Sequence, residues 1–359
     1  MPETLHGTEP GFIPPFPGSV AKYLKPDSPF QRVHGTIFPF LARRGGKVVG
    51  RIAAVVNRSH NARYGDTVGF FGFFDCEDNA EIARALFDRA ASVLREHGLT
   101  AMRGPYNPSI NDECGLLVDS HDKPPCIGFT WNPAYYEPLL LQAGFVGVRN
   151  LVGMHLPMAG VPTPERLERM ANRVAARSKM TVRPISLPKL EKELEIVHAV
   201  YNDTLERNWG FVPIAMEDLL GAADDMRAFA DAKIILIAEK DGEPAGVALT
   251  LPDFNQILHG LQRVPHLLRL PVILWRMKTR KITSCRQTVY GILPQFRDRG
   301  LHAWLLREQF ARARDRYPSA ELGWMEENNV EIIANGELLG GFVNRTFRIY
   351  ERPIPFAAA

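Results

Sequence analysis

The sequence has few cysteines, little net charge and no long uncharged apolar run, and each absence excludes a class of protein. Its four cysteines are scattered without a Cys-x-x-Cys pair, so neither a zinc site nor a disulfide framework is expected. A net charge of +3 over 359 residues is too small to predict a nucleic-acid partner. No apolar stretch is long enough to span a bilayer, and no signal peptide is visible at the N-terminus. We expect a cytoplasmic protein without a metal site, with a chain long enough for two domains.

The most informative segment that is present predicts a strand, a basic turn and a helix. An apolar strand over Val289–Leu293 is followed by Arg297, Arg299 and Gly300, and a helix begins directly afterwards. The free N–H groups of a first helical turn bind anions, a glycine lets the backbone approach, and guanidinium groups add positive charge. The segment therefore predicts a site for a phosphorylated ligand. The alternative is an ordinary helix start flanked by surface arginines.

The residues downstream support the first interpretation. A second strand over Glu321–Met325 ends in the polar cluster 326–329, and a further helix leads to Gly340-Gly341-Phe342 and a closing strand through Tyr350. This order resembles the GNAT superfamily of CoA-dependent N-acyltransferases. The pyrophosphate loop of that superfamily reads [Gln/Arg]-x-x-Gly-x-[Gly/Ala], and a later helix ends in a Gly-Phe pair. The resemblance covers roughly residues 190–352.

The resemblance places the loop on Arg297, Gly300 and His302. His302 stands where the superfamily has a small residue, and the neighbouring Ala303 relieves part of the crowding. The resemblance implies acyl-CoA as the co-substrate. The residues implied in its binding are Leu293, Arg297, Arg299, Gly300, Leu301, His302, Ala303 and Asn329.

The chain also repeats itself at an offset of about 196 residues. Two segments read as hairpins, one turning at Gly45-Gly46 and the other at Asp241-Gly242, and Leu140–Phe145 matches Leu338–Phe342 in position. We predict an α/β protein of two tandem GNAT-like domains, each a mixed central sheet flanked by helices. The predicted domains are residues 1–155 and residues 156–359, of which the second binds acyl-CoA.

The two copies differ at the turn that precedes the helix. In the first copy this turn, residues 74–81, is acidic, and Asp78 and Glu81 have the spacing of a capping box. Each close like-charge pair with a pyrophosphate would cost on the order of 1 kcal/mol. We expect the first domain not to bind CoA in the usual way and instead to shape the substrate site or the interdomain cleft.

An insertion over residues 254–283 in the second copy is apolar and basic, with no acidic residue. Gly260, Pro265 and Pro271 are expected to divide it into short helical pieces. Such a segment could cover the sheet, lie on an anionic membrane surface or line a tunnel for an acyl chain.

Two polar clusters are candidates for the acceptor site. One lies in an insertion of the first copy, residues 105–133, and the other closes the first helix of the second copy at residues 201–213. Ordinary turn chemistry and a buried helix end explain these clusters equally well. The candidate substrate-binding residues are Tyr106, Asn107, Asn111, Asn208, Trp209 and Phe211. After the first cluster, Asn132 is predicted to cap a helix over Tyr135–Gln142.

Acyl transfer from a thioester requires a bound pantetheine, an unprotonated amine and usually a general base. Glu326 is the first candidate for the base because it follows the strand beside the phosphate strand, and Asp112 and Glu113 are its rivals. Tyr290 and Tyr350 are candidates for protonating the leaving thiolate.

The motifs at residues 70–75, 107–111 and 209–211 resemble a bacterial family of tandem GNAT-like proteins. Bacterial ceramide synthases are GNAT-type N-acyltransferases, so the resemblance suggests long-chain acyl transfer to the amine of a sphingoid base. The lipid acceptor implies peripheral contact with the inner face of the cytoplasmic membrane. The alternatives are an aminoacyl-tRNA-dependent transferase of the peptidoglycan type and a non-catalytic acyl-CoA- or lipid-binding protein.

Overall fold

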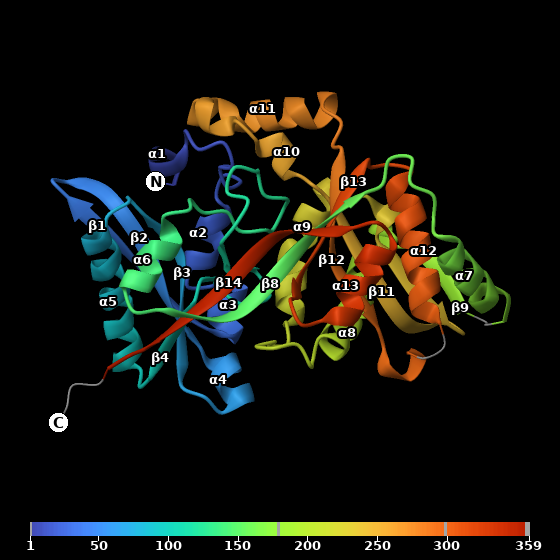
Figure 1. Cartoon of the computed structure of the whole chain (residues 1–359), viewed down its shortest axis with the longest axis horizontal. Helices are drawn as coiled ribbons and strands as arrows, with labels where there is room; N and C mark the ends of the chain where they lie inside the picture. Colours follow the sequence, from blue (N-terminus) through green and yellow to red (C-terminus); the bar gives the residue numbers. More distant parts are fainter. Residues whose placement is uncertain (1, 178–179, 298–299, 356–359) are drawn as a thin grey trace. The chain divides into compact units, whose positions relative to one another are not determined.

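The computed structural model describes residues 2–177, 180–297 and 300–355 (Figure 1). The chain forms two compact units. Unit 1 comprises Met1–Leu151, Asn255–Arg280 and Arg345–Ala359, and unit 2 comprises Val152–Phe254 and Lys281–Asn344.

Unit 1 begins with short helices, continues through the first copy of the repeat and also contains the helices of the later insertion. Its elements are α1 (Pro2–His6), α2 (Ser19–Leu24), α3 (Pro29–Val33), β1 (Gly35–Arg44), β2 (Lys47–Asn57), α4 (Arg58–Tyr64), β3 (Val68–Cys76), α5 (Ala80–Glu96), β4 (Ala101–Gly104), β5 (Tyr106–Asn107), β6 (Glu113–Cys114), β7 (Leu116–Leu117), α6 (Tyr136–Gln142), the first half of β8 (Val146–Pro157), α10 (Asn255–Leu258), α11 (His266–Thr279) and the second half of β14 (Phe342–Pro353).

Unit 2 contains the second copy. Its elements are the second half of β8, α7 (Glu165–Arg177), β9 (Met180–Pro184), α8 (Leu190–Thr204), α9 (Met216–Phe229), β10 (Leu236–Lys240), β11 (Glu243–Pro252), β12 (Ser284–Ile292), α12 (Leu301–Arg314), β13 (Ser319–Glu326), α13 (Val330–Leu338) and the first half of β14.

Each unit has a mixed sheet. The strand order is β1-β2-β3-β4-β14-β8 in unit 1 and β8-β13-β12-β11-β10-β9 in unit 2. The pairs β3–β4 and β12–β13 are parallel, whereas β1–β2, β2–β3, β10–β11 and β11–β12 are antiparallel. The predicted fold class, a mixed α/β sheet flanked by helices in two tandem copies, is confirmed.

The hairpins of the repeat agree in detail. β1 and β2 turn between Arg44 and Lys47, and β10 and β11 turn between Lys240 and Glu243. Both hairpins carry an irregularity at the same place, after Ala42 in the first and after Ala238 in the second. The predicted turns at Gly45-Gly46 and Asp241-Gly242 are therefore confirmed.

The last strand of each copy serves the sheet of the other. β14 pairs with β4 of unit 1, from Tyr350 opposite Gly104 to Pro353 opposite Ala101, and β8 lies beside β13 in the sheet of unit 2. The backbone of a strand needs a neighbouring strand to pair with, and its apolar side chains need a core to pack against. Each copy supplies a neighbouring strand and a core to the last strand of the other copy. The sequence repeat does not predict this exchange.

The insertion is grouped differently from the predicted domains, which assign residues 254–283 to the second. Residues 255–280 belong to unit 1, where the Asn255 side chain donates to the Pro125 carbonyl at 3.0 Å and the Gln262 side chain to the Gly7 carbonyl at 3.3 Å. Pro271 does not end a helix as predicted, because α11 continues through it. The carbonyl that Pro271 leaves without a donor belongs to Leu267, whose 93% exposure keeps that turn accessible to water.

Two helix caps also differ from prediction. The N-cap of α5 is Asn79 and not Asp78, because the Asn79 side chain accepts from the N–H groups of Glu81 and Ile82. The predicted cap Asn132 instead binds the N–H and carbonyl groups of Leu117, at 2.8 and 3.0 Å, and the N-cap of α6 is Tyr135. Among the described residues no helix is both long and apolar enough to cross a membrane.

Candidate functional site

In unit 2 the parallel strands β12 and β13 separate before they end. Their ladder runs from Ser284 opposite Ser319 to Gln287 opposite Leu322. Both strands continue beyond it, β12 to Ile292 and β13 to Glu326. Strand segments outside a ladder carry backbone N–H and carbonyl groups that an extended ligand can bind.

Helix α12 is the next α-helix after β12, beyond a short 3-10 turn at Pro294–Phe296, and among the described residues no side-chain cap is found at its start. Gly300 holds the N-cap position in the left-handed region, at φ 74°, and the N–H groups of Ala303 and Trp304 return to the Gly300 carbonyl. Leu301 and Ala303 are buried and fix the helix to the sheet. The N–H groups ahead of Ala303 are thus oriented outward as an anion site requires.

Arg297 is exposed beside this turn, and its Nε donates to the Ile292 carbonyl at 3.1 Å. Among the described residues no hydrogen bond to the two outer nitrogens of this guanidinium is found, so they can bind a ligand. Leu293 is half-buried and donates its N–H to the Ala245 carbonyl. Arg299 lies outside the described residues.

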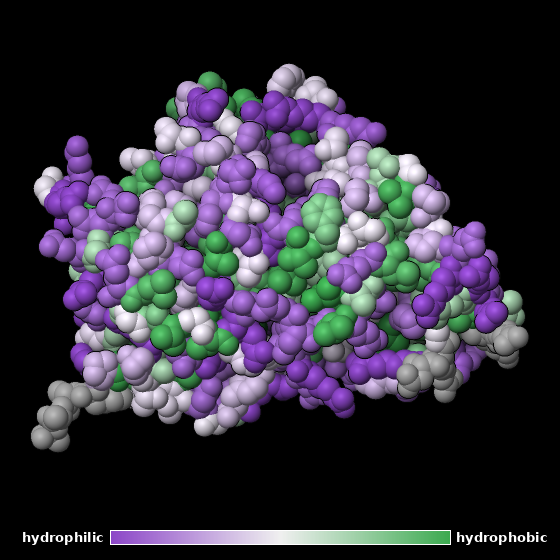
Figure 2. All heavy atoms as spheres, in the orientation of Figure 1, coloured by the Kyte–Doolittle hydropathy of each residue, from purple (hydrophilic) through white to green (hydrophobic). Residues whose placement is uncertain are grey.

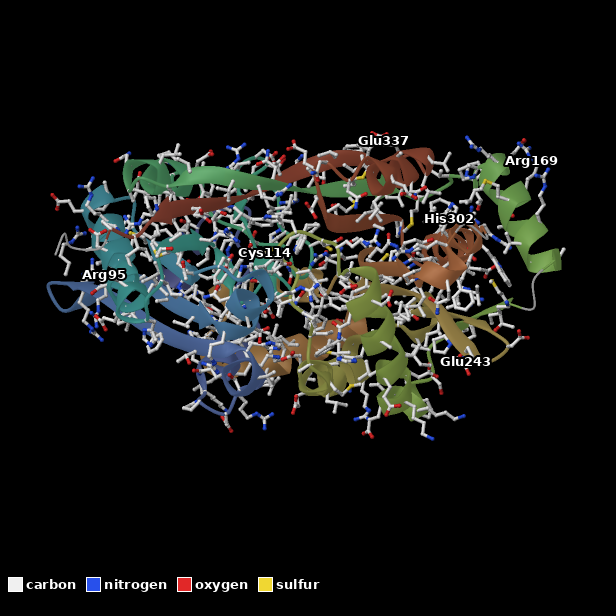
Figure 3. All side chains as sticks on the ribbon, turned by 90° about the horizontal axis from the view of Figure 1, so that it is seen from below. Arg95, Cys114, Arg169, Glu243, His302 and Glu337 are labelled. Atoms are coloured by element: carbon white, nitrogen blue, oxygen red, sulfur yellow. The ribbon has the colours of Figure 1, made fainter. Side chains whose placement is uncertain are left out.

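Tyr290 on β12 contacts the same turn. Its hydroxyl donates to the His302 carbonyl at 2.5 Å, and the His302 side chain itself is exposed on α12 (Figure 3). Burial raises the pKa of Tyr290. The hydroxyl is therefore a hydrogen-bond donor that fixes the start of α12, and the exposed imidazole leaves the backbone of the loop uncovered.

At the end of β13 the structure brings two predicted groups together. The Glu326 carboxylate accepts the backbone N–H of Trp209 at 2.9 Å, across 117 positions of sequence. Trp209 and Asn208 are half-buried, and Phe211 is buried against Tyr201 of α8. The predicted base and the second polar cluster thus lie next to each other at the end of β13.

The predicted CoA ligand Asn329 has a structural partner. Its side chain caps α13 by accepting the Ile332 N–H at 3.3 Å. The surface after it is apolar, and Figure 2 shows apolar side chains gathered in the area of α13. The exposed members of this surface are Val330, Ile332, Leu338, Phe342 and Val343.

A polar group that the sequence analysis did not identify lies on three neighbouring strands of unit 2. His155 Nδ1 and the Glu321 carboxylate are 2.9 Å apart, and the Asn344 amide donates to the same carboxylate at 3.2 Å. The His155 side chain is 33% exposed. An imidazole held by a carboxylate can accept and release protons. No local motif marks these residues, because they are far apart in sequence.

In unit 1 the corresponding space is filled. The ladder between β3 and β4 covers Val68–Phe70, and beyond it the Phe73 N–H donates to the Asn107 side chain at 2.6 Å. Gly72 lies directly against the Tyr106 carbonyl, since a Cβ at Gly72 would come within 1.6 Å of it. Tyr106 is buried and stacked on Phe70. The predicted substrate residues Tyr106 and Asn107 thus hold this segment against β3.

The remaining candidates of the first cluster hold a turn. Asp112 accepts from the Ser109 hydroxyl at 2.6 Å and from the Tyr23 hydroxyl at 3.1 Å, and the Asn111 N–H donates to Ser109 at 3.2 Å. Glu113 is exposed on β6 and pairs with Asn107 of β5.

Tyr350 lies in the core of unit 1. Its hydroxyl donates to the Glu137 carboxylate, which also binds Arg348 at 3.0 Å. Burial and the Glu137 carboxylate raise the pKa of Tyr350. Within unit 2 the structure therefore places Tyr290, Arg297, Gly300 and Glu326, whereas Tyr350, Asp112 and Glu113 belong to unit 1.

Comparison with known proteins agrees with this architecture. No protein-family model matches the chain. The chain is 29% identical over 360 residues to the bacterial ceramide synthase of Caulobacter vibrioides (strain NA1000 / CB15N), covering 99% of this chain and 93% of that protein. It is 26% identical over 361 residues to protein YghO of Escherichia coli (strain K12), covering 99% and 91%.

A solved structure shares the fold. The tandem GNAT protein from the clavulanic acid biosynthesis pathway superposes with a TM-score of 0.56 at 14% identity, covering 98% of this chain and 92% of that one. The chain therefore has a tandem GNAT-type acyltransferase fold, as the resemblance in its sequence implies.

Proposed function

We propose that the protein is an N-acyltransferase that moves a long-chain acyl group from acyl-CoA to the amine of a lipid, a sphingoid base in particular. The observation that carries the proposal is the site in unit 2. There the separated ends of β12 and β13 lead to an uncapped helix start on one strand and to a carboxylate on the other.

The residues of unit 2 divide the chemistry among them. The first turn of α12 and Arg297 bind the phosphates, and the free strand ends bind the extended part of the donor. Once the ammonium has lost one proton, the neutral acceptor nitrogen attacks the thioester carbonyl carbon and the C–N bond forms. The C–S bond breaks, and the second proton lost by the nitrogen passes to the sulfur, which leaves as the CoA thiol. Glu326 takes the proton that the ammonium must lose, because it is the carboxylate at the end of β13.

The choice of a lipid acceptor has two supports. One is the similarity over nearly the full length to a bacterial ceramide synthase. The other is the apolar surface of α13, which follows directly on the strand that carries Glu326 and suits an alkyl chain.

Binding and turnover are tested together. Affinities for CoA, acetyl-CoA and palmitoyl-CoA are measured for the wild type and for Arg297→Glu/Arg299→Glu, and turnover is measured with palmitoyl-CoA and sphinganine. We expect palmitoyl-CoA to bind more tightly than acetyl-CoA, and the double variant to bind at least about tenfold more weakly, since each lost charge contact is worth roughly 1 kcal/mol or more. Turnover is also measured for Glu326→Gln. The control for that variant is Glu327→Gln, because Glu327 is an exposed neighbour of Glu326.

Each alternative has its own outcome. Unchanged CoA affinity in the double variant contradicts the phosphate site. Binding without turnover with any amine, unaffected by Glu326→Gln, indicates a non-catalytic acyl-CoA-binding protein. Activity that requires a charged tRNA in place of CoA indicates the peptidoglycan type of transferase.

A further inference from the structure

Helix α11 of unit 1 exposes five large apolar side chains on one side, whereas Ile273 on its other side is buried. We call this set the α11 outer face, and its members with their exposed fractions are Leu267 (93%), Leu268 (54%), Leu270 (54%), Leu274 (52%) and Trp275 (59%). A surface helix ordinarily buries its apolar stripe against the core. Single exposed leucines need no explanation, but five large apolar side chains on one short helix indicate a surface that is covered in use.

The inward side of α11 holds two arginines, and their contacts fix the helix in this orientation. The Arg269 guanidinium binds both oxygens of Glu3, at 2.5 and 2.7 Å, and its Nε donates to the Val264 carbonyl. The Arg276 Nη1 donates to the carbonyls of Ile257 and His259, at 2.7 and 2.9 Å. Turning the helix over would strip buried guanidinium groups of these partners, which is strongly unfavourable.

The charges around the outer face are positive. Residues 254–283 contain no aspartate or glutamate. Glu3, an acidic residue that contacts α11, is paired with Arg269, and this pairing lowers the pKa of Glu3. The exposed basic residues of the segment within unit 1 are Arg263, Lys278 and Arg280, together with His259 and His266.

We propose that the α11 outer face docks on an anionic lipid bilayer. The leucines and Trp275 enter the boundary between headgroups and acyl chains, and the flanking basic side chains bind the lipid phosphates. A second copy of the chain would bring the same positive charges face to face, whereas anionic lipids neutralise them. The inference concerns a surface of unit 1 and does not depend on the acyl donor or acceptor of unit 2.

The test uses the full chain and flotation with vesicles of phosphatidylcholine, with and without phosphatidylglycerol. The variant Leu270→Ser/Leu274→Ser/Trp275→Ser removes the centre of the face. The matched control is Leu41→Ser/Leu141→Ser/Val146→Ser, because these residues of unit 1 are equally exposed, at 56%, 52% and 61%. A second variant, Lys278→Glu/Arg280→Glu, leaves the apolar residues in place. Thermal melting verifies that all variants fold.

We expect the wild type to bind the anionic vesicles, to bind neutral vesicles more weakly, and to release as salt rises. The triple variant and the charge variant should each lose about tenfold or more in partition coefficient, and the control should stay within about twofold. The fluorescence of Trp275 should shift to the blue on binding, a signal that Trp275→Phe removes while the other tryptophans report the background.

Three results would overturn the proposal. The first is wild-type protein that binds neither kind of vesicle. The second is a control variant that loses as much binding as the triple variant. The third is a triple variant that binds vesicles normally but dissociates an oligomer in size-exclusion chromatography, which would assign the face to a second copy.

Discussion

Helix α5 in unit 1 and helix α12 in unit 2 follow equivalent strands of the repeat, but their first turns are completed differently. The side chain of Asn79 occupies the N–H groups at the start of α5, with bonds of 3.0 and 3.1 Å. The start of α12 has Gly300 in the corresponding place and no side-chain cap. The strand, turn and helix of the first copy therefore provide a side-chain acceptor for the first N–H groups of the helix. In the second copy the N-cap residue provides none, as the proposed phosphate site requires.

The two units also differ in the space beside the strands that precede these helices. In unit 1 the segment at Tyr106 and Asn107 packs against β3, and the carboxylates of Asp75 and Glu77 are each 2.5 Å from an arginine nitrogen. Two of the four carboxylates in the acidic turn, residues 74–81, are thus paired with arginines, and the space beside β3 is filled as well. In unit 2 the ends of β12 and β13 stay apart.

The largest expected effect is on turnover in unit 2. Glu326→Gln should lower kcat by about 100-fold or more, because a positioned base contributes roughly 10²–10⁴-fold, while the affinity for acyl-CoA stays unchanged. Steady-state kinetics with palmitoyl-CoA and sphinganine measure both. If Glu326→Gln has a near-normal kcat and His155→Gln has a greatly reduced one, the general base is the His155–Glu321 pair and not Glu326.

The next effect concerns the backbone at the start of α12. Gly300→Ala should weaken acyl-CoA binding by about tenfold, since a Cβ at φ 74° is strained and would lie 2.7 Å from Val174. Gly98→Ala in unit 1 is the matched control, with φ 75° and open space around the new Cβ. Titration with CoA measures both variants, and equal losses would show that general instability accounts for the effect.

Removing the cap in unit 1 sharpens the comparison. Asn79→Ala should lower the free energy of unfolding by about 1 kcal/mol, because two N–H groups lose their acceptor, and should leave acyl-CoA affinity unchanged. Asn329→Ala removes the equivalent cap from α13 in unit 2. Urea denaturation and CoA titration are carried out on both variants. If Asn329 also contacts the ligand, as the resemblance implies, Asn329→Ala binds CoA more weakly, and if it only caps the helix, the CoA affinity of that variant is unchanged.

The last effect is absent at neutral pH and is shared by both units. Burial raises the pKa of Cys76 and of Cys285 from 9.0 to about 12. Between pH 9 and 12 both thiols keep their protons in the folded state, whereas an unfolded chain loses them. The free energy of unfolding is therefore unaffected by these thiols below pH 9 and falls as the pH rises from 9 to 12. Buried tyrosines act in the same direction. Urea midpoints at neutral and alkaline pH measure the fall, which should be smaller in Cys76→Ala/Cys285→Ala.

Local signals in the sequence predict much of this structure. The hairpin turns and the strand–turn–helix at Arg297 follow from glycine positions and apolar alternation, which act over a few residues. The sequence also identifies Glu326 and Trp209 separately, but not the bond between them. Asn132 shows the limit of such reasoning, since its composition fits a helix cap and its actual partner is Leu117, on a distant part of the chain.

The sequence by itself determined the fold class, the repeat and the contrast between a basic and an acidic turn, because these depend on residue type and short-range spacing. The tertiary structure decided what lies next to each turn. The exchange of β8 and β14, the filling of the space beside β3, the bond from Trp209 to Glu326 and the outward apolar face of α11 all depend on contacts between residues far apart in the chain. Such contacts are set by packing and hydrogen-bond satisfaction over the whole unit, and no local pattern records them.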